Sequence, residues 1–185
     1  MVILETKRLL LRMFREDDFN DYAKIVGDPE IARYIGDGKP LSRFAAWRSM
    51  AVILGHWQLR GYGLWAVEER QSGNLIGRIG FFYPEGWPGF EIGWVLSRSY
   101  WGRGYATEGA KVALDYGFRQ LQQNRVISLI RPQNIKSVRV AERLGEKLEG
   151  KTIIFGKEAL IYAISRDDWM AREANSVHFG IMNNE

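Results

Sequence analysis

The sequence predicts an α+β domain built around a mixed, twisted sheet. Three short segments, 64–68, 75–83 and 90–96, are separated by turn residues and predict an antiparallel meander. A glycine-containing loop then precedes residues 106–121, where apolar residues repeat with helical spacing. Because a further strand and helix follow, the central unit has the order strand, loop, helix, strand, helix, which is typical of an α+β fold.

The remaining elements follow from local signals. Asp28 and Ser42 are expected to cap two helices that precede the meander. In chain order, the other predicted elements are a strand at 8–14, helices at 17–27, 28–30 and 42–58, a strand at 126–130, a helix at 134–145, strands at 152–155 and 159–165, and a helix from 167. No linker or repeat divides the chain, so we expect one domain over residues 1–175 and a flexible C-terminal tail over 176–185.

The composition is that of a globular protein and excludes several chemistries. The 185 residues are 46% hydrophobic and 26% charged, which suits one domain with a real core. The absence of cysteine excludes thiolate nucleophiles and sulfur-ligated zinc. The two histidines, His56 and His178, lack metal-ligand spacing, so we expect no metal. No apolar run approaches the ~18 residues that span a bilayer. Met1–Glu5 do not resemble a signal peptide, and we expect a cytoplasmic protein without membrane contact.

The charge is mildly basic and unevenly distributed. A net charge of +4 permits an anionic partner without identifying one. No acidic residue occurs between Asp115 and Glu142. In this stretch we expect a positive field suited to phosphates, from Arg119, Arg125, Arg131, Lys136 and Arg139.

Residues 101–107, Trp-Gly-Arg-Gly-Tyr-Ala-Thr, are the most informative about function. Glycines let a backbone approach an anion closely. The N-terminus of the following helix presents free N–H groups and a partial positive charge at the same place. This arrangement suits a pyrophosphate, although the same residues also suit a simple tight turn between strand and helix.

Two other phosphate-binding motifs fit poorly. Residues 145–152 match the fixed positions of the nucleoside-triphosphate loop, G-x-x-x-x-G-K-[ST]. They carry two acidic residues where phosphates would lie, and they lead into a strand-like segment rather than a helix. The dinucleotide motif G-x-G-x-x-G fails because Thr107 replaces its third glycine and no acidic residue follows about 20 positions later.

The segment from Tyr100 to Glu108 resembles motif A of the GNAT superfamily of acyl-CoA-dependent N-acyltransferases. Gly104 and Ala106 match two of its fixed positions, whereas Trp101 stands where Gln or Arg is usual. With this tryptophan the segment resembles the RimJ/RimL branch, the ribosomal-protein N-terminal acetyltransferases. Segments 5–12, 90–96 and 134–145 resemble further motifs of that branch, so the likeness covers about residues 5–170.

This resemblance implies a fold and a donor. It implies a single GNAT-like domain with about seven strands, mostly antiparallel, in which a central parallel pair splays apart. The donor would be acetyl-CoA, used as a co-substrate without a metal. Its pantetheine arm would bind the backbone of the strand before the glycine loop, and its diphosphate would bind the loop amides. These roles carry over to Trp94, Val95, Leu96, Gly102, Arg103, Gly104, Tyr105, Ala106, Thr107, Asn134, Ser137 and Arg143.

The resemblance also implies amine attack on a thioester, with Glu91 and Ser137 as catalytic residues. Glu91 is a carboxylate in an otherwise apolar strand, which suits a base, although an outward-facing acid would give the same pattern. Ser137 would assist the leaving thiolate, although it is also the third residue of a helix that Asn134 caps. Many relatives use a tyrosine as this acid, and the helix at 134–145 has none.

The acceptor stays open at this point. A peptide N-terminus and a small amine both fit, and a homodimer is compatible with the resemblance. Trp47 and Trp87 are candidate walls of the acceptor pocket. Two other functions also stay open: a basic nucleic-acid-binding module, which the slight charge of +4 disfavours, and a non-catalytic acyl-CoA-binding protein.

Overall fold

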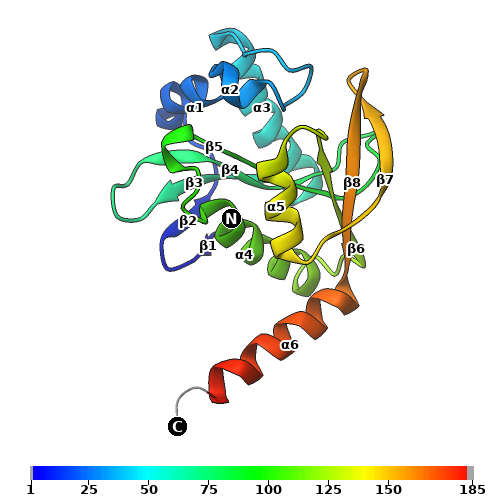
Figure 1. The fold of residues 1–185 in the computed structure, drawn as a ribbon. Coiled ribbons are helices and arrows are strands. Elements are labelled where there is room, and N and C mark those ends of the chain that lie inside the picture. The colour runs from blue at the N-terminus through cyan, green and yellow to red at the C-terminus, as the bar shows by residue number, and fades with distance from the viewer. Residues whose placement is uncertain (1, 183–185) are drawn as a thin grey trace.

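A computed structural model describes residues 2–182 and contains one eight-stranded sheet (Figure 1). The strands are β1 (Leu4–Glu5), β2 (Leu9–Arg12), β3 (Leu64–Glu69), β4 (Leu75–Phe82), β5 (Glu91–Leu96), β6 (Arg125–Ile130), β7 (Lys147–Ile154) and β8 (Lys157–Ser165). Their order in the sheet is β1-β2-β3-β4-β5-β6-β8-β7, and only the β5–β6 pair is parallel. The predicted α+β fold with a mixed, mostly antiparallel sheet is therefore confirmed.

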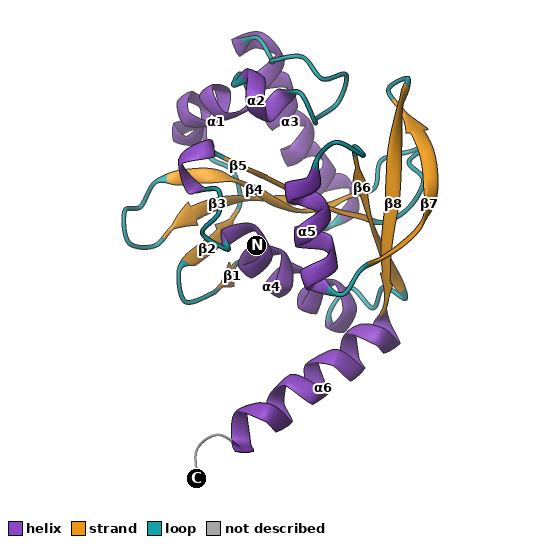
Figure 2. Cartoon of the chain, in the orientation of Figure 1, coloured by secondary structure: helices purple, strands orange, loops and turns teal. Residues whose placement is uncertain are grey.

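Helices cover both faces of this sheet. They are α1 (Phe19–Val26), α2 (Pro29–Ala32), α3 (Arg43–Arg60), α4 (Tyr105–Arg119), α5 (Ile135–Leu144) and α6 (Arg166–Met182). Figure 2 shows α1–α3 gathered at the top of the view, with α4 and α5 in front of the sheet. The predicted caps are present, since Ser42 accepts a hydrogen bond from the Ala45 N–H and Asp28 accepts one from the Glu30 N–H.

Two glycines bring α4 close to the sheet. A Cβ atom at Gly109 would lie 2.5 Å from Ile79, and one at Gly117 would lie 2.6 Å from Phe81. Such distances are shorter than any ordinary van der Waals contact, so only glycine permits this spacing. Ile79 and Phe81 therefore mark the α4 face of the sheet. The alternation of strand side chains places Arg78 and its neighbours at even positions of β4 on the opposite face.

The parallel strands β5 and β6 splay apart as the resemblance implied. Their register holds only at Glu91 opposite Ile127, whereas β6 pairs with β8 at six successive positions. Beyond this point a side chain replaces the ladder, because the Ser128 hydroxyl lies 3.1 Å from the carbonyl oxygen of Ile92. On the side of β5 that faces β6, the splay leaves backbone groups without a partner strand. The other side of β5 stays paired with β4.

The C-terminal helix α6 begins directly after β8 and extends away from the sheet (Figure 1). Its first turns are anchored by Trp169, which is fully buried and lies 6.0 Å from Phe118 between ring centroids. The domain boundary expected at residue 176 falls inside this helix, and residues 183–185 of the expected tail lie outside the described residues. Within residues 2–182, none of the helices combines the length and apolarity that crossing a membrane requires.

Candidate active site

The glycine loop opens α4 with two residues of left-handed backbone. Gly102 has a φ of +74° and Gly104 a φ of +78°, a region that side chains rarely adopt. The first helical hydrogen bond runs from the Glu108 N–H to the Gly104 carbonyl. The amides of the first turn therefore lack partners within the helix and point to the loop side. This is the geometry expected of a site for a phosphate group.

A clamp of side chains from the N-terminal strands holds this loop. Arg8 donates to the Arg103 carbonyl at 2.9 Å and to the Glu108 carboxylate at 2.6 Å. Thr6 donates to the other oxygen of the same carboxylate at 2.6 Å. Two motifs that stand 100 residues apart in the sequence thus meet at the start of α4. Since the Nε and Nη2 groups of Arg8 both contact Glu108 while Nη1 donates to the Arg103 carbonyl, the clamp fixes the direction in which the helix begins.

The aromatic residues of the loop face the protein. The Tyr105 side chain is buried and donates to Glu69, so only its backbone is turned to the loop. The Trp101 indole donates to the Leu96 carbonyl at 2.8 Å, and the Lys136 ammonium lies 4.3 Å from its ring centroid. Of the three residues predicted at the end of β5, Leu96 thus has its carbonyl engaged within the protein.

Helix α5 meets β5 across the splay. Asn134 caps this helix by accepting from the Ser137 N–H, as predicted. The Ser137 hydroxyl accepts from the Trp94 indole N–H at 3.3 Å. The Trp94 ring packs with Ile130 and Tyr162 in a small cluster. Three of the predicted site residues, Trp94, Asn134 and Ser137, are therefore brought together beside the opened strand pair.

Three of the five basic residues expected to form a positive field over residues 116–141 have their side chains engaged within the protein. Arg119 pairs with Asp115 on the same helix, and Arg125 pairs with Glu149 of β7. Arg131 is buried, and burial lowers the pKa of its guanidinium. Its donors are used on four backbone carbonyls, which sequence reasoning did not anticipate.

The remaining basic residues of this region lie on α5. Lys136, Arg139 and Arg143 are exposed. The Arg143 carbonyl accepts from Arg172 of α6 at 2.8 Å, so this part of α5 is tied to the C-terminal helix. The side chain of Arg143 is thus accessible, and its predicted contact with the donor stays a prediction.

Glu91 lies at the point where the parallel pair separates, on the face opposite α4. Desolvation raises the pKa of its carboxyl group to about 7. The Trp87 indole donates to it at 2.6 Å, and this bond, the Leu129 backbone and the charge of Arg78 each lower the pKa in part. A carboxylate that titrates near neutral pH is suited to accept a proton from a reacting group.

A buried carboxyl group close to this region, that of Glu146, was missed by sequence reasoning. It is 3% exposed, and burial, with a smaller effect from the charge of Glu91, raises its pKa to about 8. The Ser128 hydroxyl lies 3.0 Å from Glu146 and 3.1 Å from the Ile92 carbonyl. A hydroxyl has one hydrogen and a carbonyl only accepts, so both contacts are satisfied when a protonated Glu146 donates to Ser128. No sequence signal marks a buried acid directly after a helix-ending glycine.

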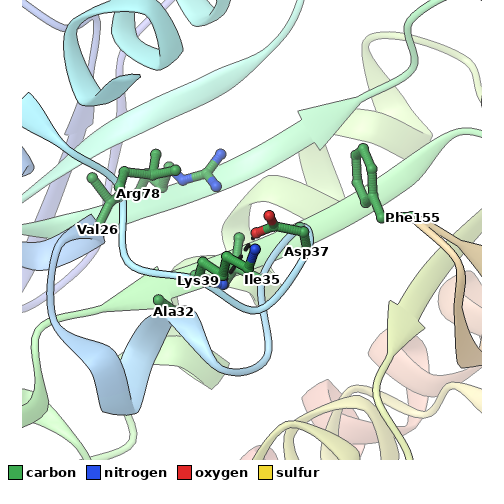
Figure 3. Close-up of a pocket in the computed structure, with 9 residues that line it drawn as sticks. Val26, Ala32, Ile35, Asp37, Lys39, Arg78 and Phe155 are labelled. Atoms are coloured by element: carbon green, nitrogen blue, oxygen red, sulfur yellow. Dashed lines mark hydrogen bonds between the residues drawn. The ribbon is translucent and has the colours of Figure 1, made fainter. Parts of the chain in front are cut away.

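A cavity of about 360 Å³ opens on the Glu91 face (Figure 3). Its walls come from Val26 and Ala32, the loop from Ile35 to Leu41, Arg78 of β4, and Phe155 at the tip of the β7–β8 hairpin. The Phe155 ring lies 6.0 Å from the Trp87 ring, which links the cavity to Glu91. Neither of the two predicted wall residues lines this cavity. Trp87 contacts both Phe155 and Glu91, whereas Trp47 is 55% exposed on α3.

Comparison with known proteins agrees with this geometry. A family model described as acetyltransferase (GNAT) domain matches residues 8–147. The chain belongs to this family. It is 33% identical to the uncharacterized N-acetyltransferase YnaD of Bacillus subtilis (strain 168), over 90% of this chain and 98% of that protein. As a GNAT protein it is an acetyl-CoA-dependent N-acetyltransferase.

Solved structures share the fold. An acetyltransferase from Agrobacterium tumefaciens superposes with a TM-score of 0.79 at 32% identity, covering 89% of this chain and 94% of that one. The ribosomal-protein α-N-acetyltransferase RimL in complex with coenzyme A superposes with a TM-score of 0.76 at 20% identity, covering 90% and 99% of the two chains. At this identity the second likeness concerns the fold alone. Among the described residues of our chain, no group of acidic or histidine side chains is arranged to hold a metal ion.

Proposed function

We propose that this GNAT protein transfers the acetyl group by direct attack of a primary amine within a ternary complex, with Glu91 as the base. The observation that carries the proposal is the position of Glu91, whose pKa is raised to about 7 at the mouth of the splayed strands. The glycine loop lies on the α4 side and the cavity on the Glu91 side. We infer that donor and acceptor meet where β5 and β6 separate, beside Glu91.

The donor is acetyl-CoA, and the residues present fit it. We assign the diphosphate to the backbone amides of residues 102–107, where the two left-handed glycines and the helix start provide unpaired donors. The pantetheine arm is assigned to the unpaired edge of β5 at Trp94 and Val95, close to Asn134 and Ser137. Together with Trp101 these positions support membership of the RimJ/RimL branch.

In the reaction the amine nitrogen forms a bond to the acetyl carbonyl carbon, and the carbon–sulfur bond breaks. The ammonium form of the acceptor must first lose a proton to solvent, which at pH 7 costs ~1.4 kcal/mol for a peptide α-amine and ~4.6 kcal/mol for a lysine. The attacking nitrogen then loses a second proton as the amide forms. Glu91 takes this proton, directly or through water. The electron pair of the broken bond leaves on sulfur, and Ser137, held by the Trp94 indole, is placed to donate a hydrogen bond to the thiolate.

Initial-rate kinetics with the full chain test the proposal. Acetyl-CoA is varied against peptides and small amines, while thiol release and the acetylated product are measured. We expect equal amounts of both, and intersecting lines in double-reciprocal plots, because the chain has no cysteine to carry the acetyl group. Acetyl-CoA binding without amine-dependent thiol release would contradict the proposal and indicate a silent acyl-CoA-binding protein. The acceptor class, a cytoplasmic location and a homodimer stay predictions.

A Trp87→Phe variant is expected to shift the pH dependence of turnover. Phenylalanine keeps an aromatic ring but removes the N–H that stabilises the charged form of Glu91. The pKa of Glu91 then rises above about 7, and the acidic limb of kcat/KM moves to higher pH. The matched control is Trp47→Phe, which alters an exposed indole on α3. An unchanged limb in Trp87→Phe would show that Glu91 does not set this profile.

An Arg8→Gln variant is expected to weaken acetyl-CoA binding while largely keeping kcat. The change removes the bonds to the Arg103 carbonyl and to Glu108 that orient the glycine loop. The ion pair is partly exposed, so we expect KM for acetyl-CoA to rise about fivefold rather than binding to be lost. Lys111→Gln, which removes an equal charge from α4, is the control and should leave KM near the native value.

A further inference from the structure

The guanidinium of Arg78 has no partner although it is partly enclosed. Its Nε atom is fully buried, and within residues 2–182 the structure gives the group neither a hydrogen bond nor an ion pair. A buried donor without an acceptor costs free energy that a bound acceptor group would recover. Arginine binds planar oxyanions, above all carboxylates, through paired N–H groups. Arg78 is therefore a candidate for binding an anion from outside the chain.

Arg78 and Glu91 lie on the same face of the sheet. In the β4–β5 register Arg78 stands opposite Val95, and Phe82 stands opposite Glu91. Residues opposite each other point to the same side, and side chains alternate along each strand. Arg78 is thus on the side where Glu91 would receive the amine, and its charge acts on the Glu91 carboxylate.

Arg78 lines the cavity that opens on this face. In Figure 3 its guanidinium lies between Val26 and Phe155. The charged lining residues are Arg78, Lys39 and Asp37, two cations and one carboxylate. One oxygen of Asp37 already accepts from the Lys39 N–H. The balance favours an anionic group over a polycation, while Val26, Ile35 and Phe155 provide apolar surface.

The cavity is held in shape by a buried arginine. Arg131 donates to the carbonyl of Gly36 in one wall and to those of Ile154 and Lys157 at the hairpin that forms the other. At the hairpin tip Phe155 has a φ of +51°, a conformation that bulky residues rarely adopt. Gly156 has a φ of +71° as well, which is the pattern of a two-residue hairpin turn between Ile154 and Lys157. The walls are thus fixed around Arg78 before a ligand binds.

We propose that Arg78 binds a carboxylate of the acceptor, so that the acceptor is a free amino acid with an apolar side chain. This inference rests on the proposed function and names its substrate class. The carboxylate pairs with Arg78, the apolar side chain contacts Phe155 and Val26, and the amino group is directed to Glu91. A cavity of about 360 Å³ is at the lower end of the range for small-molecule sites, which fits one amino acid rather than a folded peptide segment.

The test compares leucine with leucinamide and 3-methylbutylamine, and phenylalanine with its amide and 2-phenylethylamine. In the native chain we expect kcat/KM to be about tenfold or more higher for the carboxylates, because a site built for a charged group discriminates strongly against its absence. Spermidine and a peptide with N-terminal leucine are further arms. Equal or better use of the amides, the peptide or the polyamine would overturn the inference while leaving the proposed acetyl transfer intact.

Arg78→Met and Arg78→Lys show whether Arg78 causes the preference. We expect the carboxylate-to-amide ratio to fall to near one in Arg78→Met and to be partly kept in Arg78→Lys. The ratio is taken within each variant, so a change in overall turnover cancels. A native ratio in Arg78→Met would overturn the assignment.

Binding of products gives a readout that does not depend on turnover or on a folded variant. Calorimetry of the native chain with N-acetyl-leucine and N-acetyl-leucinamide, each in the presence of coenzyme A, is expected to show tighter binding of the acid. Equal affinities would overturn the inference. If no amine in the panel releases thiol, the proposed function fails, and this binding difference still decides the role of Arg78.

Discussion

A Glu91→Gln variant is expected to lower kcat about 100-fold or more at pH 7, as loss of a general base does. Glutamine keeps the size of the side chain and can still accept from the Trp87 indole, so the site should keep its shape. What it loses is the ability to take a proton at a pKa of about 7. Turnover, acetyl-CoA affinity and the pH profile of kcat/KM are to be measured on the same preparation.

The three readouts separate a base from a binding residue. We expect acetyl-CoA affinity within about twofold of the native value, since the glycine loop lies on the other face of the sheet. The acidic limb near pH 7 should disappear, leaving only the titration of the amine itself. Glu85→Gln, which neutralises an exposed acid in the turn before β5, is the control. Intact turnover together with weakened acetyl-CoA binding would refute the role given to Glu91.

Local signals were enough to predict much of this site. The glycine loop is recognisable because Gly102 and Gly104 must adopt positive φ angles, and such positions leave a mark in the sequence. The cap at Asn134 and the helix end at Gly145 have equally local causes. Glu91 stands out because a carboxylate interrupts an apolar strand. In each case the physics acts within a few residues.

Other features depend on contacts between distant segments. The Arg8–Glu108 clamp joins motifs 100 residues apart, and neither motif shows that the two side chains meet. The absence of nearby acids predicts that Arg131 belongs to a positive field for phosphates. In the structure its guanidinium instead donates to backbone carbonyls of a loop and a hairpin. Arg78 looks like an ordinary polar residue in an alternating strand. Only the fold shows that its guanidinium has no hydrogen bond or ion pair among residues 2–182.

The short strand and the edge strand illustrate the same limit. Strand β1 has two residues, too few for a periodic pattern. Strand β7 begins at Lys147, five residues before the predicted start at residue 152. The sequence does not show this first half of the strand, because its residues are charged and exposed at the edge of the sheet. Its strand character there comes from pairing with β8 rather than from its own composition.

A Glu146→Gln variant is expected to make the protein more stable at alkaline pH. The folded pKa of Glu146 is about 8, whereas the ordinary pKa of a glutamate, which we take for the unfolded chain, is 4.5. Between these values the folded chain holds a proton that the unfolded chain releases, so the free energy of unfolding falls as pH rises from 4.5 to about 8. At about 1.4 kcal/mol per pKa unit, the native residue destabilises the fold by several kcal/mol at pH 9.

Glutamine removes this slope without removing the hydrogen bond. Its amide can donate to Ser128 as the protonated acid does, which leaves the Ser128 hydroxyl free to donate to Ile92. Urea unfolding at several values between pH 5 and pH 9 should give native and variant proteins of similar stability at pH 5 and a difference that grows toward pH 9. The exposed neighbour Glu142 provides the control variant, Glu142→Gln. Parallel curves for native and Glu146→Gln proteins would contradict a buried, protonated acid.

Glu91 and Glu146 should also influence each other's titration. Glu146 is mostly protonated at pH 7, so replacing it should leave the acidic limb of the turnover profile, set by Glu91, nearly unmoved. The charge of Glu91 raises the pKa of Glu146, so Glu91→Gln should lower that pKa, and the loss of stability due to Glu146 should end at a lower pH and be smaller. Unfolding curves of Glu91→Gln over the same pH range measure this shift. Protonated Glu146 donates to Ser128, and Ser128 in turn donates to the carbonyl of Ile92, the residue next to Glu91. The protonation of Glu146 is therefore linked both to the stability of the splayed strands and to the position of Glu91.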